Sequence, residues 1–374
     1  MRRLLSWLHL WVGLVAGTLF AVLGLSGSLL VFHEDLLRWQ HPQLEGHVLE
    51  PDGEVLAAIL ARETPRGLRS IQFPDASMPT WIGFYEDGRR GYFAPEDGDL
   101  LLMRSTGDDF LLWLQDLHIH FLAGEAGEQV VGIVGWVALG VLLTGLYLWW
   151  PKRGKLKLSL RWFTNPPVRR WLTWHRSTGV LLMPLVLLLT LTGVGMVYHS
   201  GARSLLTGMF GGGETPAAPV RARTGEPDWP AIVARARAGL PAAHLTRTAL
   251  PAPGDGVVSF RARMPREWHV NGRSTVHVDL AGKEVLRAHD ATAQAAGARM
   301  TEAIYPLHIG AVGGPLLRWL TALAGLVPAF LLVTGFLFWL RRPARKKRIA
   351  EVPAARPAPT MRGCVSAPTR SNPR

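Results

Sequence analysis

The sequence contains one cysteine, Cys364, which lies in a tail rich in proline and arginine. A single cysteine excludes a disulfide within the chain, and it also excludes a metal site built from several thiolates. Aspartate and glutamate are missing from the four longest apolar segments. A metal cage made of carboxylates is therefore excluded inside those segments.

The four apolar segments each have 20 or more residues and cover 10–32, 130–150, 178–198 and 316–340. A helix of about 20 residues is long enough to cross the roughly 30 Å of hydrocarbon in a bilayer. The sequence therefore predicts a membrane protein with four spanning helices. The first segment follows Arg2 and Arg3 as in a signal peptide, but it is longer than a signal-peptide core, so we interpret it as a retained helix.

Positive and negative charges are separated along the chain. Residues 151–170 contain seven Lys or Arg and no acid, and residues 341–348 contain six more basic residues. Residues 34–126 contain 17 acids, seven Arg and no Lys. The positive-inside rule places both termini and the 151–170 loop in the cytoplasm, with the two long connections on the other side. The net charge of +13 is thus explained by topology and does not indicate nucleic-acid binding.

An internal repeat relates the two halves of the chain. A shift of 166 residues aligns the first span with the third and places His9 on His175, Gly27 on Gly193 and His33 on His199. A shift of 190 aligns the second span with the fourth and places His118 on His308 and Thr144-Gly145 on Thr334-Gly335. Two repeats of the same orientation predict a four-helix transmembrane bundle with a pseudo-two-fold axis along the membrane normal.

The long connections also resemble each other. Residues 90–103 and 274–288 each read as two strands joined by a tight turn at Gly98 or Gly282, and helical stretches precede them at 53–63 and 228–240. We expect a small α+β module in each connection. The predicted order is span 1–33, module 34–109, interfacial segment and span 110–151, basic loop 152–170, span 171–199, flexible linker 200–227, module 228–300, interfacial segment and span 301–340, and disordered basic tail 341–374.

Histidines occupy matched positions in the two repeats. A lone histidine at a helix end is usually a boundary residue, but three matched placements point to a shared chemical task. Neutral imidazole is a common metal ligand and a standard axial ligand of haem iron. The candidate ligands are His9, His175, His33, His199, His118 and His308. His120 stands where the second half has Gly310, and its role is open.

Depth sorts these histidines into two groups. His9 and His33 are 24 residues apart, which is roughly 36 Å along a helix, so they cannot share a site. His9 and His175 predict an inner centre. The other four histidines are predicted to form an outer centre. Its pairing is open: His33 with His199, His118 with His308, or a crossed arrangement.

Small and basic residues near the inner histidines have two interpretations each. Gly13, Gly17 and Gly179 follow His9 or His175 on one helical face, where they either leave room for a flat porphyrin or allow close helix packing. Arginines at this end either bind haem propionates or anchor the helices at the membrane surface. They are Arg3, Arg169, Arg170 and Arg176.

The span sequences resemble the PepSY-associated transmembrane family. The segments LHLWVGLVAGTLFAVLGLSGSLLVFHE and WHRSTGVLLMPLVLLLTLTGVGMVYH share the form H-x-x-x-G…(S/T)-G…(F/Y)-H. LHIHFLAGEAGEQVVGIVGWVALGVLLTGLYLWWPKR is similar to the family's second span, and VHVDLAGKEVL to the end of a PepSY module. The fourth span departs from the pattern, because Leu340-Arg341 stands where the second has Trp150-Pro151.

The resemblance implies an inner-membrane protein of bacterial iron uptake that holds two haem b groups on these six histidines. Electrons from a cytoplasmic or quinol donor would reduce a ferric siderophore in the periplasm, and no separate catalytic side chain is assigned. A different class of function is a membrane-anchored PepSY protein that regulates or chaperones a secreted peptidase. Transport through the bundle has little support, since Pro184 and Pro328 are the only signs of a broken span.

Overall fold

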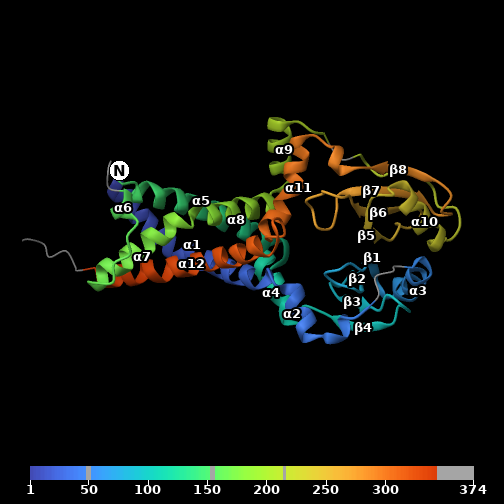
Figure 1. Ribbon diagram of the computed structural model, residues 1–374, viewed down its shortest axis with the longest axis horizontal. Coiled ribbons are helices and arrows are strands. Elements are labelled where there is room, and N and C mark those ends of the chain that lie inside the picture. Colours follow the sequence, from blue (N-terminus) through green and yellow to red (C-terminus); the bar gives the residue numbers. More distant parts are fainter. Residues whose placement is uncertain (48–51, 152–155, 214–215, 343–374) are drawn as a thin grey trace, which may run out of the picture.

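The structure is a computed structural model that describes residues 1–47, 52–151, 156–213 and 216–342. It consists of a bundle of apolar helices and a β-sheet at one end of that bundle (Figure 1). We call the two ends of the bundle the sheet end and the basic end. Residues 343–374 of the predicted tail, which include Cys364, lie outside the described residues, as do 48–51 of the first module, 152–155 of the basic loop and 214–215 of the linker.

In the part of the chain that the structure describes, three helices are long and apolar enough to cross a membrane by themselves: α1 (Arg2–Leu30), α5 (Gly124–Trp149) and α12 (Gly314–Arg341). A fourth span is formed if α7 (Pro167–Leu181) and α8 (Met183–Val197) are counted as one, although they meet at 62°. Pro184 lies just after this break and cannot donate a backbone hydrogen bond to the preceding turn. The sequence marked Pro184 as a possible kink in the third span, and the bend lies beside it. Pro328, in contrast, lies inside a continuous helix.

Helices α1 and α12 make the closest crossing in the bundle through small residues. A side chain at Gly24 would collide with the carbonyl oxygen of Gly325, and the Ser28 hydroxyl donates to the carbonyl of Ala322 at 2.8 Å. Such contacts replace the hydrophobic effect as the source of helix association in lipid. This crossing holds the first and last spans together.

One antiparallel sheet of eight strands contains both predicted hairpins. The strand order is β4-β3-β2-β1-β5-β6-β7-β8, so β1 and β5 join the two halves. The two separate modules that we expected are therefore one sheet, and four of its strands were not predicted. The strands are β1 (Leu68–Gln72), β2 (Trp81–Tyr85), β3 (Arg90–Phe93), β4 (Leu100–Arg104), β5 (His244–Ala249), β6 (Val257–Arg263), β7 (Ser274–Asp279) and β8 (Val285–His289).

Helices α3 (Gly53–Glu63) and α10 (Trp229–Gly239), both predicted, cover one face of this sheet. Asp52 and Asp228 begin them by accepting hydrogen bonds from backbone N–H groups of the first turn. Apolar side chains that alternate along the strands fill the space below them. They include Ile71, Trp81, Phe93, Phe260 and Val276, each 2% exposed or less.

Short helices connect the sheet to the bundle: α2 (His33–Gln40), α4 (Phe110–His120), α9 (His199–Phe210) and α11 (Ala296–His308). Helix α4 does not continue into α5 as we expected, because Phe121 and Leu122 take positive φ values of 45° and 61° and reverse the chain. Residues 200–210 were predicted as linker but belong to α9. The remaining short helices are η1 (Pro42–Leu44), η2 (Thr64–Arg66), α6 (Leu156–Ser159) and η3 (Ala291–Ala293).

Candidate functional site: two histidine pairs

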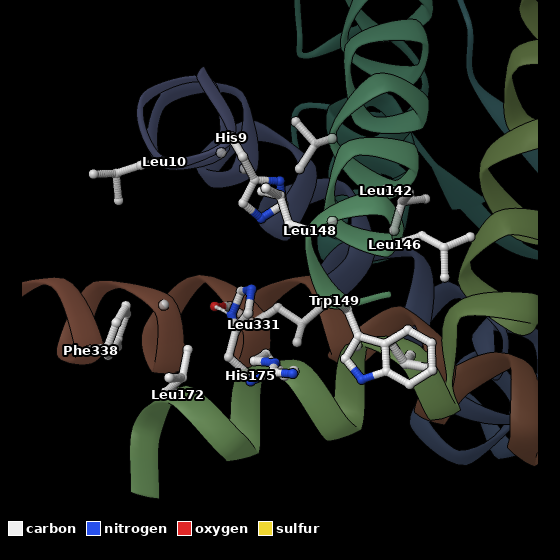
Figure 2. Close-up of a pocket in the computed structure, with 18 of the residues that line it drawn as sticks. His9, Leu10, Leu142, Leu146, Leu148, Trp149, Leu172, His175, Leu331 and Phe338 are labelled. Atoms are coloured by element: carbon white, nitrogen blue, oxygen red, sulfur yellow. Dashed lines mark hydrogen bonds between the residues drawn. The ribbon is translucent and has the colours of Figure 1, made fainter. Parts of the chain in front are cut away.

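His9 and His175 form a pair near the basic end of the bundle. His9 lies on α1 and His175 on α7, and their ring centroids are 6.2 Å apart with an angle of 85° between the ring planes. Figure 2 shows the two side chains extending toward each other from facing helices. The structure thus brings together the two residues predicted for the inner centre.

Each ring of this pair rests on a Thr-Gly dipeptide of a neighbouring helix. Thr144 on α5 lies 3.1 Å from His9 Nδ1, and a Cβ atom on Gly145 would lie 3.1 Å from His9 Cε1. His175 Nδ1 donates to the carbonyl oxygen of Leu331 at 2.9 Å and lies 3.5 Å from the Thr334 hydroxyl, while a Cβ on Gly335 would lie 3.2 Å from its ring. Glycine is needed in both places because a side chain would crowd the imidazole.

His118 and His308 form a second pair at the sheet end, with ring centroids 6.2 Å apart and planes at 41°. His118 extends from α4 onto Ser26-Gly27 of α1, where its Nδ1 lies 3.0 Å from the Ser26 hydroxyl and a Cβ on Gly27 would lie 2.8 Å from its ring. His308 extends from α11 onto Thr192-Gly193 of α8, with corresponding distances of 3.0 and 3.1 Å.

The hydroxyl groups determine which ring nitrogen carries the proton. The Thr144 hydroxyl donates to the carbonyl of Val141 at 3.0 Å, Ser26 to Val22 at 2.8 Å and Thr192 to Leu188 at 2.8 Å. With its one hydrogen on that carbonyl, each hydroxyl oxygen is left to accept from the imidazole. Nδ1 of His175 and of His308 also lies 2.9 and 3.1 Å from the carbonyl oxygens of Leu331 and Leu189, which can only accept. The proton therefore lies on Nδ1, and Nε2 keeps its lone pair. This is the arrangement in which a histidine binds a metal through Nε2.

A cavity of about 790 Å³ adjoins the inner pair and is lined by His9, His175, Gly13, Gly17 and Gly179. Cβ atoms on these three glycines would make ordinary contacts at 3.9, 3.7 and 3.5 Å, so close helix packing does not require glycine there. Added side chains would instead extend toward the cavity. The volume is in the usual range for a site that encloses a cofactor, about 300–1,000 Å³.

Four arginines are among the residues that line the cavity, and we call them its rim. Arg169 and Arg176, which we predicted, are among its lining residues, and so are Arg2 and Arg342, which we did not predict. The predicted Arg3 and Arg170 are not among the residues that line it. Arg170 stacks on Trp171 at 4.5 Å. The charged rim would complement an anionic group that extends from an apolar cavity toward water.

His33 and His199 are not part of the second pair, in which His118 lies against His308, one of the predicted pairings. Both side chains are exposed, each at the start of a short helix, and His33 Nδ1 lies 3.1 Å from the carbonyl oxygen of Leu30. His120 binds Asp116 at 2.7 Å. Within the described ranges, no three His, Cys, Asp or Glu side chains are grouped to hold a bare metal ion.

The dimensions of both pairs fit a planar macrocycle between two imidazoles. A metal–nitrogen bond of about 2.0 Å on each side, plus about 1.1 Å from each nitrogen to its ring centre, gives a centroid separation of about 6 Å. The two pairs measure 6.2 Å. The proton on Nδ1, the glycines that adjoin the rings and the cavity beside the inner pair all fit haem bound through two Nε2 atoms.

A comparison with protein families shows to which family the chain belongs. The PepSY-associated TM region matches residues 6–342, which is nearly the whole described chain, so the protein belongs to this family of membrane proteins. The expected resemblance is thereby confirmed. Among curated proteins, no match was found.

Proposed function

We propose that this protein is an inner-membrane b-type di-haem reductase that moves electrons across the bilayer to a ferric siderophore in the periplasm. The observation that carries the proposal is the pair of matched sites, each with two imidazoles 6.2 Å apart whose Nδ1 atoms are held by a hydroxyl or a carbonyl. His9 and Gly27, which mark the two sites on α1, are 18 residues apart, or about 27 Å along the helix. One haem at each site would supply the one-electron chemistry.

The residues of the chain would fix the cofactor position and its surroundings. Ser26, Thr144 and Thr192 orient their histidines and make Nε2 a better electron donor by accepting the Nδ1 proton in a hydrogen bond. Leucine and tryptophan side chains, among them Leu146 and Trp149, line the cavity beside the inner pair and give it an apolar wall (Figure 2). The arginine rim would bind the haem propionates.

The sites also support the proposed repeat and topology. His9 of the first span rests on Thr144-Gly145 of the second, and His118, on the short helix before the second span, rests on Ser26-Gly27 of the first. The second half repeats this: His175 rests on Thr334-Gly335, and His308, on the short helix before the fourth span, rests on Thr192-Gly193. We infer two repeats of the same orientation, with the basic end in the cytoplasm and the sheet in the periplasm, because Arg2, Arg169, Arg176 and Arg342 all line the cavity at the basic end.

Regulation of a secreted peptidase is the alternative, and it would use the sheet while the helices served as anchors. Peptidase regulation does not explain why four histidines each pack against a Ser-Gly or Thr-Gly dipeptide of another helix. An absorption spectrum of the purified protein separates the two: the reductase shows a Soret band that shifts on reduction, and a haem-to-protein ratio of two. A protein that folds without any Soret band would contradict the proposal.

Variants then assign each site. His9→Ala and His118→Ala should each lower the ratio from two haems to one, while His244→Ala, an exposed position on β5, should leave it unchanged. Thr192→Val removes the hydroxyl at His308 and should weaken haem binding there about ten- to hundredfold. Thr190→Val is its control, because the Thr190 hydroxyl donates only to the carbonyl of Val186.

A further inference from the structure

The face of the sheet opposite α3 and α10 carries a row of arginines across neighbouring strands. Arg104 on β4 is paired in register with Arg90 on β3, and Arg90 is paired with Phe84 on β2. Beyond β1, Arg247 on β5 is directly opposite Arg261 on β6. We call these four residues the arginine row. Figure 1 shows α3 and α10 at the side of the sheet remote from the bundle, so the row is on the side of the membrane helices.

Three arginines of the row have no carboxylate partner. Arg104 is neutralised by Asp109 at 2.6 Å. Across the described chain, Arg90, Arg247 and Arg261 form no ion pair; Arg90 donates to the Gln115 amide at 2.9 Å and Arg247 to the Gln72 amide at 3.3 Å. The carboxylates that act on Arg90 and Arg261 have other partners: Asp109 pairs with Arg104 at 2.6 Å, Glu302 pairs with Arg273 at 2.7 Å, and Glu267 accepts from the backbone N–H of Met264 at 2.9 Å.

This arrangement is electrostatically unfavourable without a ligand. Like charges directly opposite each other on a sheet destabilise it, and all three side chains are half-buried. Burial and the neighbouring guanidinium groups of Arg261 and Arg90 lower the pKa of Arg247 to about 10, and burial lowers the pKa of Arg90 and Arg261 as well. The guanidinium groups still carry their charge at neutral pH. A bound anion would remove the repulsion.

Aromatic rings accompany the row. The Arg247 guanidinium lies 4.0 Å from the centre of the Phe84 ring, and that of Arg90 lies 5.7 Å from it. Tyr305 of α11 is stacked on His269 at 5.2 Å. Burial and the Glu34 carboxylate raise the pKa of the Tyr305 hydroxyl, and the nearby Arg247 and Arg90 oppose this rise. Tyr305 precedes His308 by three residues, which is one helical turn. The row is therefore next to the histidine pair at the sheet end.

We propose that Arg90, Arg247 and Arg261 bind a multiply charged, oxygen-rich anion on this face of the sheet. Planar guanidinium forks bind pairs of anionic oxygens, and the adjoining rings suit a ligand with aromatic groups. That the anion is a ferric chelate rests on the proposed function. The ligand class is then a catecholate or carboxylate chelate with net negative charge, while a neutral trihydroxamate chelate would leave the repulsion in place.

Binding is measured on the full chain in detergent with the gallium tris-catecholate complex, which carries three negative charges and is not reduced. The neutral gallium tris-hydroxamate complex and inorganic phosphate are the comparison ligands. Arg247→Gln and Arg261→Gln should each weaken tris-catecholate binding about ten- to hundredfold, because a hydrogen bond to a charged group is lost. Arg89→Gln removes the same charge from the exposed β2–β3 turn and should bind as the parent protein does.

The melting temperature distinguishes a ligand site from a structural role. Without ligand, Arg247→Gln should melt at the same temperature as the parent or above it, since a repulsion is removed; a marked decrease would assign the row to folding. If the Arg247→Gln/Arg261→Gln double variant binds the tris-catecholate complex as tightly as the parent protein does, the proposed site is wrong. If the parent protein binds the neutral complex as tightly as the tris-catecholate complex, or if phosphate competes at equal ionic strength, the proposed ligand class is wrong. Haem content is recorded on each sample, so loss of haem with intact binding refutes only the proposed function.

Discussion

Gly145→Ala tests the steric side of the histidine sites. The new Cβ would lie 3.1 Å from His9 Cε1, whereas carbon atoms make their best contacts at about 3.5–4.0 Å. The ring must therefore move by about 0.4–0.9 Å, away from the helix that carries Thr144. The distance of 3.1 Å between His9 Nδ1 and the Thr144 hydroxyl then exceeds the hydrogen-bond limit of about 3.2 Å.

Loss of this orienting bond should weaken haem binding at the inner site about ten- to hundredfold. Fold stability should not fall, because alanine is favoured over glycine in a helix interior by about 1 kcal/mol. The control is Gly140→Ala on the same helix, where a Cβ meets no heavy atom within 4 Å. Haem titration into the apoprotein, followed by Soret absorbance, measures the affinity of both variants. Equal affinities in Gly145→Ala and Gly140→Ala would refute the steric argument.

Two further predictions concern stability. Gly325→Ala should lower the free energy of unfolding by about 1–3 kcal/mol, because its Cβ collides with Ser28 and would lie 2.7 Å from the carbonyl oxygen of Gly24. Denaturant titration measures this difference. A stability equal to the parent's would show that the crossing of α1 and α12 tolerates separation. Burial alone would raise the pKa of Glu63, but hydrogen bonds from Tyr85 and Arg62 lower it. The ionised Glu63 side chain therefore stabilises the fold fully above about pH 5, and this stabilisation is lost as the pH falls below about 4. The melting temperature of Glu63→Gln should depend less on pH in this range than that of the parent protein. An unchanged pH dependence would contradict the role of Glu63.

Several parts of the fold and of the candidate sites could be predicted from the sequence because they depend on local pattern. The apolar segments, the helices at 53–63 and 228–240 and the turns at Gly98 and Gly282 follow from periodicity, charge and glycine placement. The pairing of His9 with His175 followed from their matched depth.

The remaining features depend on contacts between distant residues. The choice of His118 with His308 requires the reversal at Phe121 and Leu122, which brings α4 onto α1, and neither residue favours positive φ. The joining of two modules into one sheet depends on pairing between β1 and β5, almost 180 residues apart. The Ser-Gly and Thr-Gly dipeptides were visible as a repeated motif, but their role as supports for histidines of another span was not.

The pairing of β1 with β5 has a structural consequence. Three residue pairs join the strands: Ser70 with Ala249, Ile71 with Thr248 and Gln72 with Arg247. His118 reaches the bundle through α4, which follows the first half of the sheet, and His308 through α11, which follows the second half. The three residue pairs between β1 and β5 therefore connect the half of the sheet that precedes α4 with the half that precedes α11.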